Sequence, residues 1–504
     1  MIDLFDSFKR SENKITIPTE SDGGNKLSVS SELSFNLEYI KRKTDKNSDV
    51  IIRDLKIYKS DAALVFCDGL CNSQLVSEGI IKPLHSIEKL PLKSEEIAEY
   101  IVEESYSGAE VKTVTDLNDI FFPLYSGFCV LIVDKCKKAF LFGAQGFEKR
   151  SVDQPYTEVQ EKGAMESFVE TLTDNVALLH RRIKTPELKT EEIKIGSLGQ
   201  PKVLICYLKG RADEKYVKNI KERLQNAKLD TVLNSDYLRA FLDTDFLSFF
   251  SAVGSTERPD VFASKLAEGR VGVMTDGSPF ALYMPFLFSE SFQSLDDYSY
   301  RPYYTFFIRI LRILCFFISV MLPGVYVAVC VYHQEVLSQA LLVEIAVQEN
   351  VTPFSITVEA LVVHIMYEIV REAGLRMPKA VGHAVSIVGA LVIGEAAVTA
   401  GIIAAPMVII VALTAIGSFV VSPLYEAVSV LRLLMIIIGG ISGFFGIMLG
   451  FGVLVINICA LNPYGVPYAS TVVPLEKGTL RDGVIRESWK SLGKRVLSIS
   501  KLEK

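Results

Sequence analysis

One stretch of the chain, between Lys379 and Glu426, carries a single formally charged residue, Glu395. A membrane-spanning helix needs about 20 mainly apolar residues. The stretch is longer than one span requires and has Gly401 and Pro406 near its middle, so it predicts two spans. A carboxylate at membrane depth is costly and usually faces a cavity or a partner, which makes Glu395 the first candidate functional residue.

Two more uncharged runs, 313–334 and 433–475, flank this stretch, whereas the residues before Tyr300 mix charged and apolar types as soluble proteins do. The N-terminal residues have no apolar core, so we expect no cleaved signal peptide and a cytosolic N-terminal region. The net charge of -6 gives no reason to expect nucleic-acid binding. The composition therefore predicts a soluble region followed by a multi-pass membrane domain.

Short apolar segments in the soluble region alternate with amphipathic, helix-like segments such as 166–183. This alternation predicts an α/β cytosolic region of two subdomains, followed by an α-helical polytopic membrane domain. The predicted strands are 61–66, 128–134, 202–208 and 271–284. The expected domains are a mobile segment (1–35), two cytosolic subdomains (36–185 and 186–300), a transmembrane domain of four to six helices (301–470) and a basic cytosolic tail (471–504).

Basic residues orient the spans, because cytosolic loops are enriched in Lys and Arg. Arg309 and Arg312 precede the first apolar run, and Arg371 and Arg376 mark a second cytosolic turn. The segment 333–354 has acidic residues but no Lys or Arg, which predicts an amphipathic helix at the outer face. Two cytosolic ends require an even number of crossings. Five candidate runs therefore mean that one is re-entrant or interfacial, or that the last run folds back on itself.

The segment after Pro378 predicts a helix with two distinct faces. The candidate pore lining is a stripe of residues at spacings of four and three: Val381, Val385, Val388, Val392, Glu395 and Thr399. In several copies its valines would form a dry gate, and a ring of Glu395 carboxylates would attract cations. Small residues on another face are candidate helix contacts: Gly382, Gly389 and Ala396. Ordinary packing of the valines, and a protonated Glu395 bonded to a neighbouring helix, remain the alternatives.

Catalytic and metal-binding motifs are absent from the sequence. It has no phosphate-binding loop, no G-x-S-x-G turn and no H-E-x-x-H helix, so we expect no enzyme, no cofactor and no metal. His364 and Glu368 are four residues apart, but two ligands are too few for a metal site. The five cysteines of the soluble region are expected to be thiols, and the three in the apolar runs are expected to act as small apolar residues. Asp68 and Asp276, each followed by Gly, indicate turns or helix caps, with ligand capture as the alternative.

Long ordered motifs across residues 35–470 strongly resemble the A subunit of the GerA family of spore germinant receptors. They include VTPFSITVEALVVHIMYEIVREAGLRMPKAVGHAVSIVG, PYGVPY, the DGL at Asp68, the GFEKRS at Gly146, the LLHRRIKTPEL ending at Leu188, the STERPD at Ser255, the DGSPF at Asp276 and the DYSYR at Asp297. The chain departs from the family pattern where Gly163, Ala164 and Met165 replace a Gly-Pro-Arg and where His180 replaces an Arg.

The resemblance implies a germinant-receptor subunit in the spore inner membrane. Its implied partners are a transporter-like B subunit that binds the nutrient, a lipoprotein C subunit and further copies of this chain. It also implies an oligomeric, nutrient-gated cation channel. The alternative is a non-conducting scaffold or transporter subunit, although the internally repeated halves of a secondary transporter are not seen.

Overall fold

The computed structural model describes residues 27–87, 111–146, 155–245, 248–377 and 394–470. The chain divides into two compact units. The first comprises Met1–Arg150 with Ile183–Glu187, and the second comprises Ser151–Arg182 with Leu188–Lys504. The predicted helical segment 95–105 lies outside the described residues.

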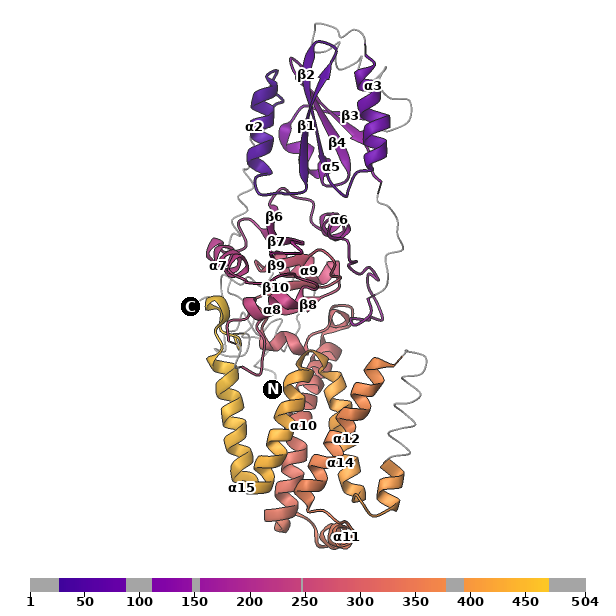
Figure 1. The fold of residues 1–504 in the computed structure, drawn as a ribbon, viewed down its shortest axis with the longest axis vertical. Coiled ribbons are helices and arrows are strands. Elements are labelled where there is room, and N and C mark those ends of the chain that lie inside the picture. The colour runs from indigo at the N-terminus through magenta and orange to yellow at the C-terminus, as the bar shows by residue number, and fades with distance from the viewer. Residues whose placement is uncertain (1–26, 88–110, 147–154, 246–247, 378–393, 471–504) are drawn as a thin grey trace, which may run out of the picture. The chain divides into compact units, whose positions relative to one another are not determined.

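The first unit is built on a five-stranded antiparallel sheet with the order β1-β2-β4-β5-β3. Apolar residues of its strands, such as Leu131 and Val133, pack in one core with Leu84 of helix α3 (Lys82–His85). Helices α2 (Leu33–Lys43) and α3 flank the sheet in Figure 1. The strands are β1 (Val50–Ile57), β2 (Ser60–Cys67), β3 (Val111–Val114), β4 (Phe128–Val133) and β5 (Ala139–Gly143). The apolar segments 61–66 and 128–134 are therefore strands, as predicted.

The second unit contains another five-stranded antiparallel sheet, with the order β6-β7-β9-β10-β8. Its strands are β6 (Leu188–Lys194), β7 (Lys202–Leu208), β8 (Gly254–Thr256), β9 (Val271–Thr275) and β10 (Ala281–Met284). Its helices are α6 (Leu172–Arg182), α7 (Glu214–Gln225), α8 (Asp236–Leu242) and α9 (Pro259–Ala267). The predicted apolar segment 271–284 forms two strands, because Asp276 and Gly277 make a turn within it.

The apolar helices belong to this second unit and follow its sheet in the chain. They are α10 (Pro302–Tyr332), α11 (Gln339–Glu349), α12 (Ile356–Arg376), α14 (Ala405–Val420) and α15 (Tyr425–Ala460). Among the described helical segments, Pro302–Tyr332 and Ser422–Ala460 are long and apolar enough to cross a membrane, and Ala405–Val420 is a shorter apolar helix. The two-subdomain α/β region followed by apolar helices confirms the predicted fold class.

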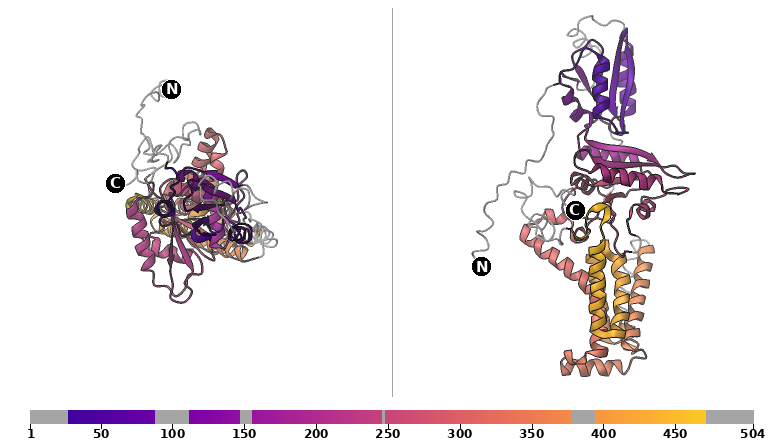
Figure 2. Two further views of the ribbon diagram at one scale, coloured as in Figure 1. Left: turned by 90° about the horizontal axis from the view of Figure 1, so that it is seen from above. Right: turned by 90° about the vertical axis from the view of Figure 1, so that its left-hand side faces the viewer.

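Helix α15 is a hairpin of two arms that reverse at Gly443 (Figures 1 and 2). Gly443 has a φ of 59° and a ψ of -147°, a conformation that glycine adopts without steric penalty. A side chain at Gly446 would meet Ile438, and one at Gly450 would meet Met435, as expected for arms that face each other. The last apolar run therefore folds back on itself, which was one of the arrangements that the sequence left open.

Helix α11 lies crosswise at the ends of the other helices (Figures 1 and 2). The expected helix within 333–354 is present, but the expectation that it is amphipathic is wrong. Val343, Val347 and Glu344 are all exposed, so apolar and charged residues share its open surface. Apolar residues occupy nearly every position from 340 to 347, so they surround the helix instead of gathering on one face.

Candidate functional site at the junction of the second sheet and the apolar helices

The start of α10 is tied to the preceding turn by a buried carboxylate. Asp297, in the short helix Leu295–Tyr298, accepts hydrogen bonds from Arg309 Nε at 3.0 Å and from Arg312 at 2.9 Å to each carboxylate oxygen. Asp297 and Arg309 are each 1% exposed. Thr305 Oγ1 adds a bond to the Asp297 carbonyl at 2.9 Å. Because an unpaired buried charge is strongly destabilising, this cluster holds α10 in one position relative to the turn.

The segment that follows α15 returns to the second sheet. Val466 is fully buried in the core of that sheet, and the Tyr464 hydroxyl donates a hydrogen bond to the Leu242 carbonyl at the end of α8. The Tyr468 ring packs between Phe250 and Phe288, with ring centres 6.2 and 5.9 Å away. The motif PYGVPY therefore anchors the exit of the apolar helices, as the Asp297 cluster anchors their entry.

A second buried ion cluster supports the turn before α10. Glu290 accepts hydrogen bonds at 2.6 Å from Lys265, on α9, and from both terminal nitrogens of Arg270. Burial alone would raise the pKa of Glu290, but the adjacent Arg270 and Lys265 charges lower it to about 2. The carboxylate is thus ionised and ties the segment after β10 to α9 and to the residue preceding β9.

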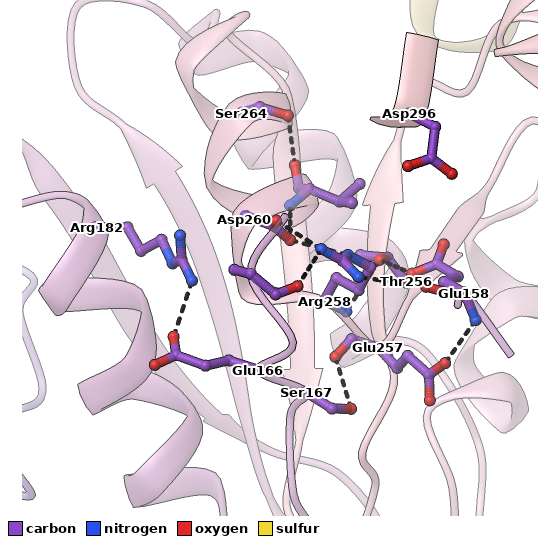
Figure 3. A network of polar contacts seen from close by, with 12 residues as sticks. Glu158, Glu166, Ser167, Arg182, Thr256, Glu257, Arg258, Asp260, Ser264 and Asp296 are labelled. Carbon is purple, nitrogen blue, oxygen red and sulfur yellow. Dashed lines mark hydrogen bonds and ion pairs between the residues drawn. The ribbon is translucent and has the colours of Figure 1, made fainter. Parts of the chain in front are cut away.

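The STERPD motif organises the segment 157–168 (Figure 3). Arg258, 1% exposed, binds both carboxylate oxygens of Asp260 at 3.1 and 2.8 Å, and it donates to the Ala164 carbonyl at 2.7 Å. The Glu257 carboxylate accepts the backbone N–H groups of Thr157 and Glu158. At Ala164 the acceptor is a backbone carbonyl, which every residue type has. The contact with Arg258 is therefore kept although Gly163, Ala164 and Met165 stand in place of the family's Gly-Pro-Arg.

Two further features of the soluble region, the basic pair at the end of α6 and the candidate Asp276, have structural roles. Arg181 and Arg182 both pair with Glu166, at 3.0 and 2.8 Å. Asp276 accepts the Leu172 backbone N–H at 3.2 Å and so caps the start of α6, one of the roles considered from its position beside a glycine. Neither feature leaves a set of groups that converge on a ligand. Across the described residues, no group of His, Cys, Asp or Glu could hold a metal ion.

Most of the predicted pore stripe lies outside the described residues, namely Val381, Val385, Val388 and Val392, together with Gly382 and Gly389. Glu395, Ala396 and Thr399 lie in the described helical turns that follow, and all three are exposed in the single chain. Thr399 Oγ1 donates to the Glu395 carbonyl at 2.8 Å, which places the two residues one turn apart on one face. The pore-lining and helix-contact assignments therefore remain predictions.

Glu359 has a role that sequence reasoning missed. Its side chain is 0% exposed, and it accepts the Ala404 backbone N–H at 2.7 Å, just before α14 begins. Gln348 accepts the next N–H, that of Ala405, at 3.1 Å. The two side chains satisfy donors that a helix N-terminus leaves without partners. Glu359 was visible in the sequence as a charge in an apolar run, but its partner is 45 residues away.

Within the described residues, a close contact between helix backbones involves glycines that the sequence did not single out. A Cβ on Gly439 would lie 2.5 Å from the Gly324 carbonyl oxygen, and a Cβ on Gly324 would lie 2.5 Å from that of Met435. The backbones of α10 and α15 therefore meet at two glycines. The sequence contains many glycines in its apolar runs, and none of their spacings distinguishes this pair.

The chain resembles known proteins over nearly its whole length. The family model described as Bacillus/Clostridium GerA spore germination protein matches residues 38–497. Spore germination protein KA of Bacillus subtilis (strain 168) is 39% identical over 481 residues, which is 94% of this chain and 88% of the relative. Spore germination protein GerLA of Bacillus cereus is 32% identical over 457 residues, 90% of this chain and 92% of that one.

A solved structure is also similar. It is the N-terminal domain of the A subunit of the Bacillus megaterium spore germinant receptor GerK3, at 32% identity and a TM-score of 0.42, covering 53% of this chain and 99% of that one. The family match spans most of the chain, and the matches cover 88% and 92% of the two relatives above. The chain therefore belongs to the GerA family of spore germination proteins, among relatives that are A-type subunits.

Proposed function

We propose that this chain is the membrane subunit of a nutrient-responsive receptor in the spore inner membrane, and that several copies form a cation channel that opens to trigger germination. The family and its A-type relatives support the receptor role. By the same resemblance, the chain works with a transporter-like B subunit that binds the nutrient and with a lipoprotein C subunit. Residues 1–300 face the cytosol.

The observation that carries this proposal is that both ends of the apolar region are held: α10 is tied to the turn that precedes it, and the segment after α15 is docked on the second sheet. Asp297 binds the start of α10, and Tyr464 and Val466 dock the segment after α15. A movement of this soluble part would therefore act on the first and the last apolar helix together. Such a linkage suits a subunit that converts a signal from one region into a helix rearrangement in another.

The exposed position of Glu395 supports conduction. A carboxylate in a membrane helix is costly in contact with lipid, and in this chain Glu395 points away from the chain's own core. Around a central axis of several copies, its charge would face water and attract cations. Thr399, one turn further and exposed on the same face, would add a hydroxyl ligand.

Planar-bilayer recording of the chain reconstituted with its B and C partner subunits, with the nutrient added, tests the proposal. Single-channel steps selective for monovalent cations are expected, with lower conductance for Glu395→Gln. Glu372→Gln is the matched control, because Glu372 is an exposed carboxylate near the end of α12 that pairs with Arg376. Nutrient binding without current would favour a non-conducting scaffold or transporter subunit instead. If the current is identical in wild type and Glu395→Gln, Glu395 does not line the pore.

A further inference from the structure

Arg432, on the first arm of α15, is a buried cation with unused hydrogen-bonding capacity. Its side chain is 1% exposed, and none of its three guanidinium nitrogens has a hydrogen-bond partner among the described residues. The carboxylate paired with it, Glu368 on α12, lies 3.8 Å away, beyond hydrogen-bond distance. A buried guanidinium in this condition carries a desolvation cost that a direct hydrogen bond would offset.

Glu368 is held on its other side. The Tyr425 hydroxyl lies 2.9 and 2.7 Å from the two carboxylate oxygens, and Arg371 Nε lies 3.2 Å from one of them. The Arg371 guanidinium also stacks on the Tyr425 ring, 3.6 Å from its centre. Glu368 therefore lies between two arginines and makes hydrogen bonds toward only one of them.

We propose that Glu368 is a two-position latch between α12 and α15. In the position shown by the structure it binds Tyr425 and Arg371, and in the second position it binds Arg432. A charge-assisted N–H···O bond is about 2.8 Å long, so the carboxylate needs to move by only about 1 Å toward Arg432. Each position satisfies one arginine at the expense of the other, which keeps the two arrangements close in energy and lets a small force on either helix select between them.

Thermal unfolding of the purified full chain in lipid nanodiscs tests the latch through a double-mutant cycle. Tyr425→Phe keeps the ring on which Arg371 stacks but removes the hydroxyl that holds Glu368. In this background Glu368 moves to Arg432, so Arg432→Gln should lower Tm by several degrees more than it does in wild type. The excess loss of Tm should vanish when Glu368→Gln is also present, because the extra stabilisation by Arg432 requires the Glu368 carboxylate.

Tyr367→Phe is the matched control background. The Tyr367 ring lies 5.7 Å from the Arg432 guanidinium, and phenylalanine keeps this ring. The Tyr367 hydroxyl is buried on α12 without a hydrogen-bond partner among the described residues, so removing it should leave the effect of Arg432→Gln unchanged. If Arg432→Gln gives no folded protein, Arg432→Lys replaces it, since lysine keeps the charge but loses the planar fork. Its Tm loss should likewise grow with Tyr425→Phe.

An effect of Arg432→Gln or Arg432→Lys that is equal in the wild-type and Tyr425→Phe backgrounds would overturn the latch. So would a larger loss that persists in Glu368→Gln, since it would not involve the carboxylate. The measurement needs neither nutrient nor ion current. A negative result therefore contradicts the latch and leaves the proposed receptor function to be judged by its own experiment.

Discussion

Gly324 of α10 and Gly439 of α15 bring the backbones of the two longest described apolar helices into contact, with room for a hydrogen atom but not for a methyl group at either position. α10 connects to the Asp297 cluster, and α15 connects to the segment that docks on the second sheet. The glycine contact therefore joins the two attachments within the apolar part of the chain.

Gly439→Ala should destabilise the protein by about 1–3 kcal/mol, because the added methyl group forces α10 and α15 apart in a closely packed site. The comparison is Gly452→Ala on the other arm of α15, where a Cβ would have nothing within 4 Å. Apparent Tm in mild detergent should fall for Gly439→Ala and stay near wild type for Gly452→Ala. Equal Tm values for the two variants would show that α10 and α15 accommodate the added methyl group without loss of stability.

Asp297→Asn should destabilise the protein by about 3–5 kcal/mol, since it leaves Arg309 and Arg312 without their shared carboxylate. Asp296→Asn is the adjacent control, because Asp296 forms no ion pair with another described residue and its side chain is only half-buried. Chemical denaturation of the purified chain measures both. A wild-type midpoint for Asp297→Asn would mean that the buried arginines find other partners.

Acid should lower the stability of the folded protein by protonating Glu290. The pKa of its carboxyl is about 2 in the folded chain and 4.5 without the fold, so the folded state holds the proton less tightly. The stabilisation is therefore complete above about pH 4.5 and is lost as the pH falls from there toward 2. Tm measured between pH 7 and pH 3 should fall less steeply for Glu290→Gln than for wild type. Parallel curves would mean that Glu290 does not contribute to the acid response.

Topology can be read from engineered cysteines in a Cys459→Ser background, because Cys459 is the cysteine classed as exposed within the described residues. Leu198→Cys lies in the loop between β6 and β7, and Val336→Cys lies between α10 and α11; both native side chains are exposed. In intact cells an impermeant maleimide should label Val336→Cys alone, and permeabilised cells should label both. Labelling of Leu198→Cys in intact cells would contradict the predicted cytosolic location of residues 1–300.

The predicted valine gate also has a direct test. Shrinking Val385 or Val388 to Ala should widen a dry constriction and make it easier to wet, so spores should germinate with less nutrient or lose dormancy. Glu395→Gln should instead lower conductance without blocking assembly. Wild-type behaviour of both alanine variants, with reduced abundance of Glu395→Gln, would indicate that the stripe is packing and would point to the helix 354–372 as the pore lining.

The sequence alone was sufficient for the division into soluble and apolar regions, the α/β class and the family. The two regions and the class follow from residue types and short-range periodicity, whereas the family follows from the resemblance of long ordered motifs to its A subunit. The segments at 61–66, 128–134 and 202–208 became strands because their runs of apolar residues fit buried positions in a sheet. For the glycine-rich run after Arg432, the sequence left a reversal as one of several arrangements, and the structure places the reversal at Gly443.

The tertiary structure alone decided which distant residues meet. Glu359 reaches Ala404, Asp297 binds two arginines of α10, Gly324 faces Gly439, and Val466 enters the core of a sheet whose last strand ends at Met284. Each pair is separated by a chain segment whose path depends on packing as a whole, and many carboxylates and glycines in the sequence look equally suitable. Local pattern determines what a segment becomes, whereas the partner of a buried charge or a close backbone contact depends on how the segments pack.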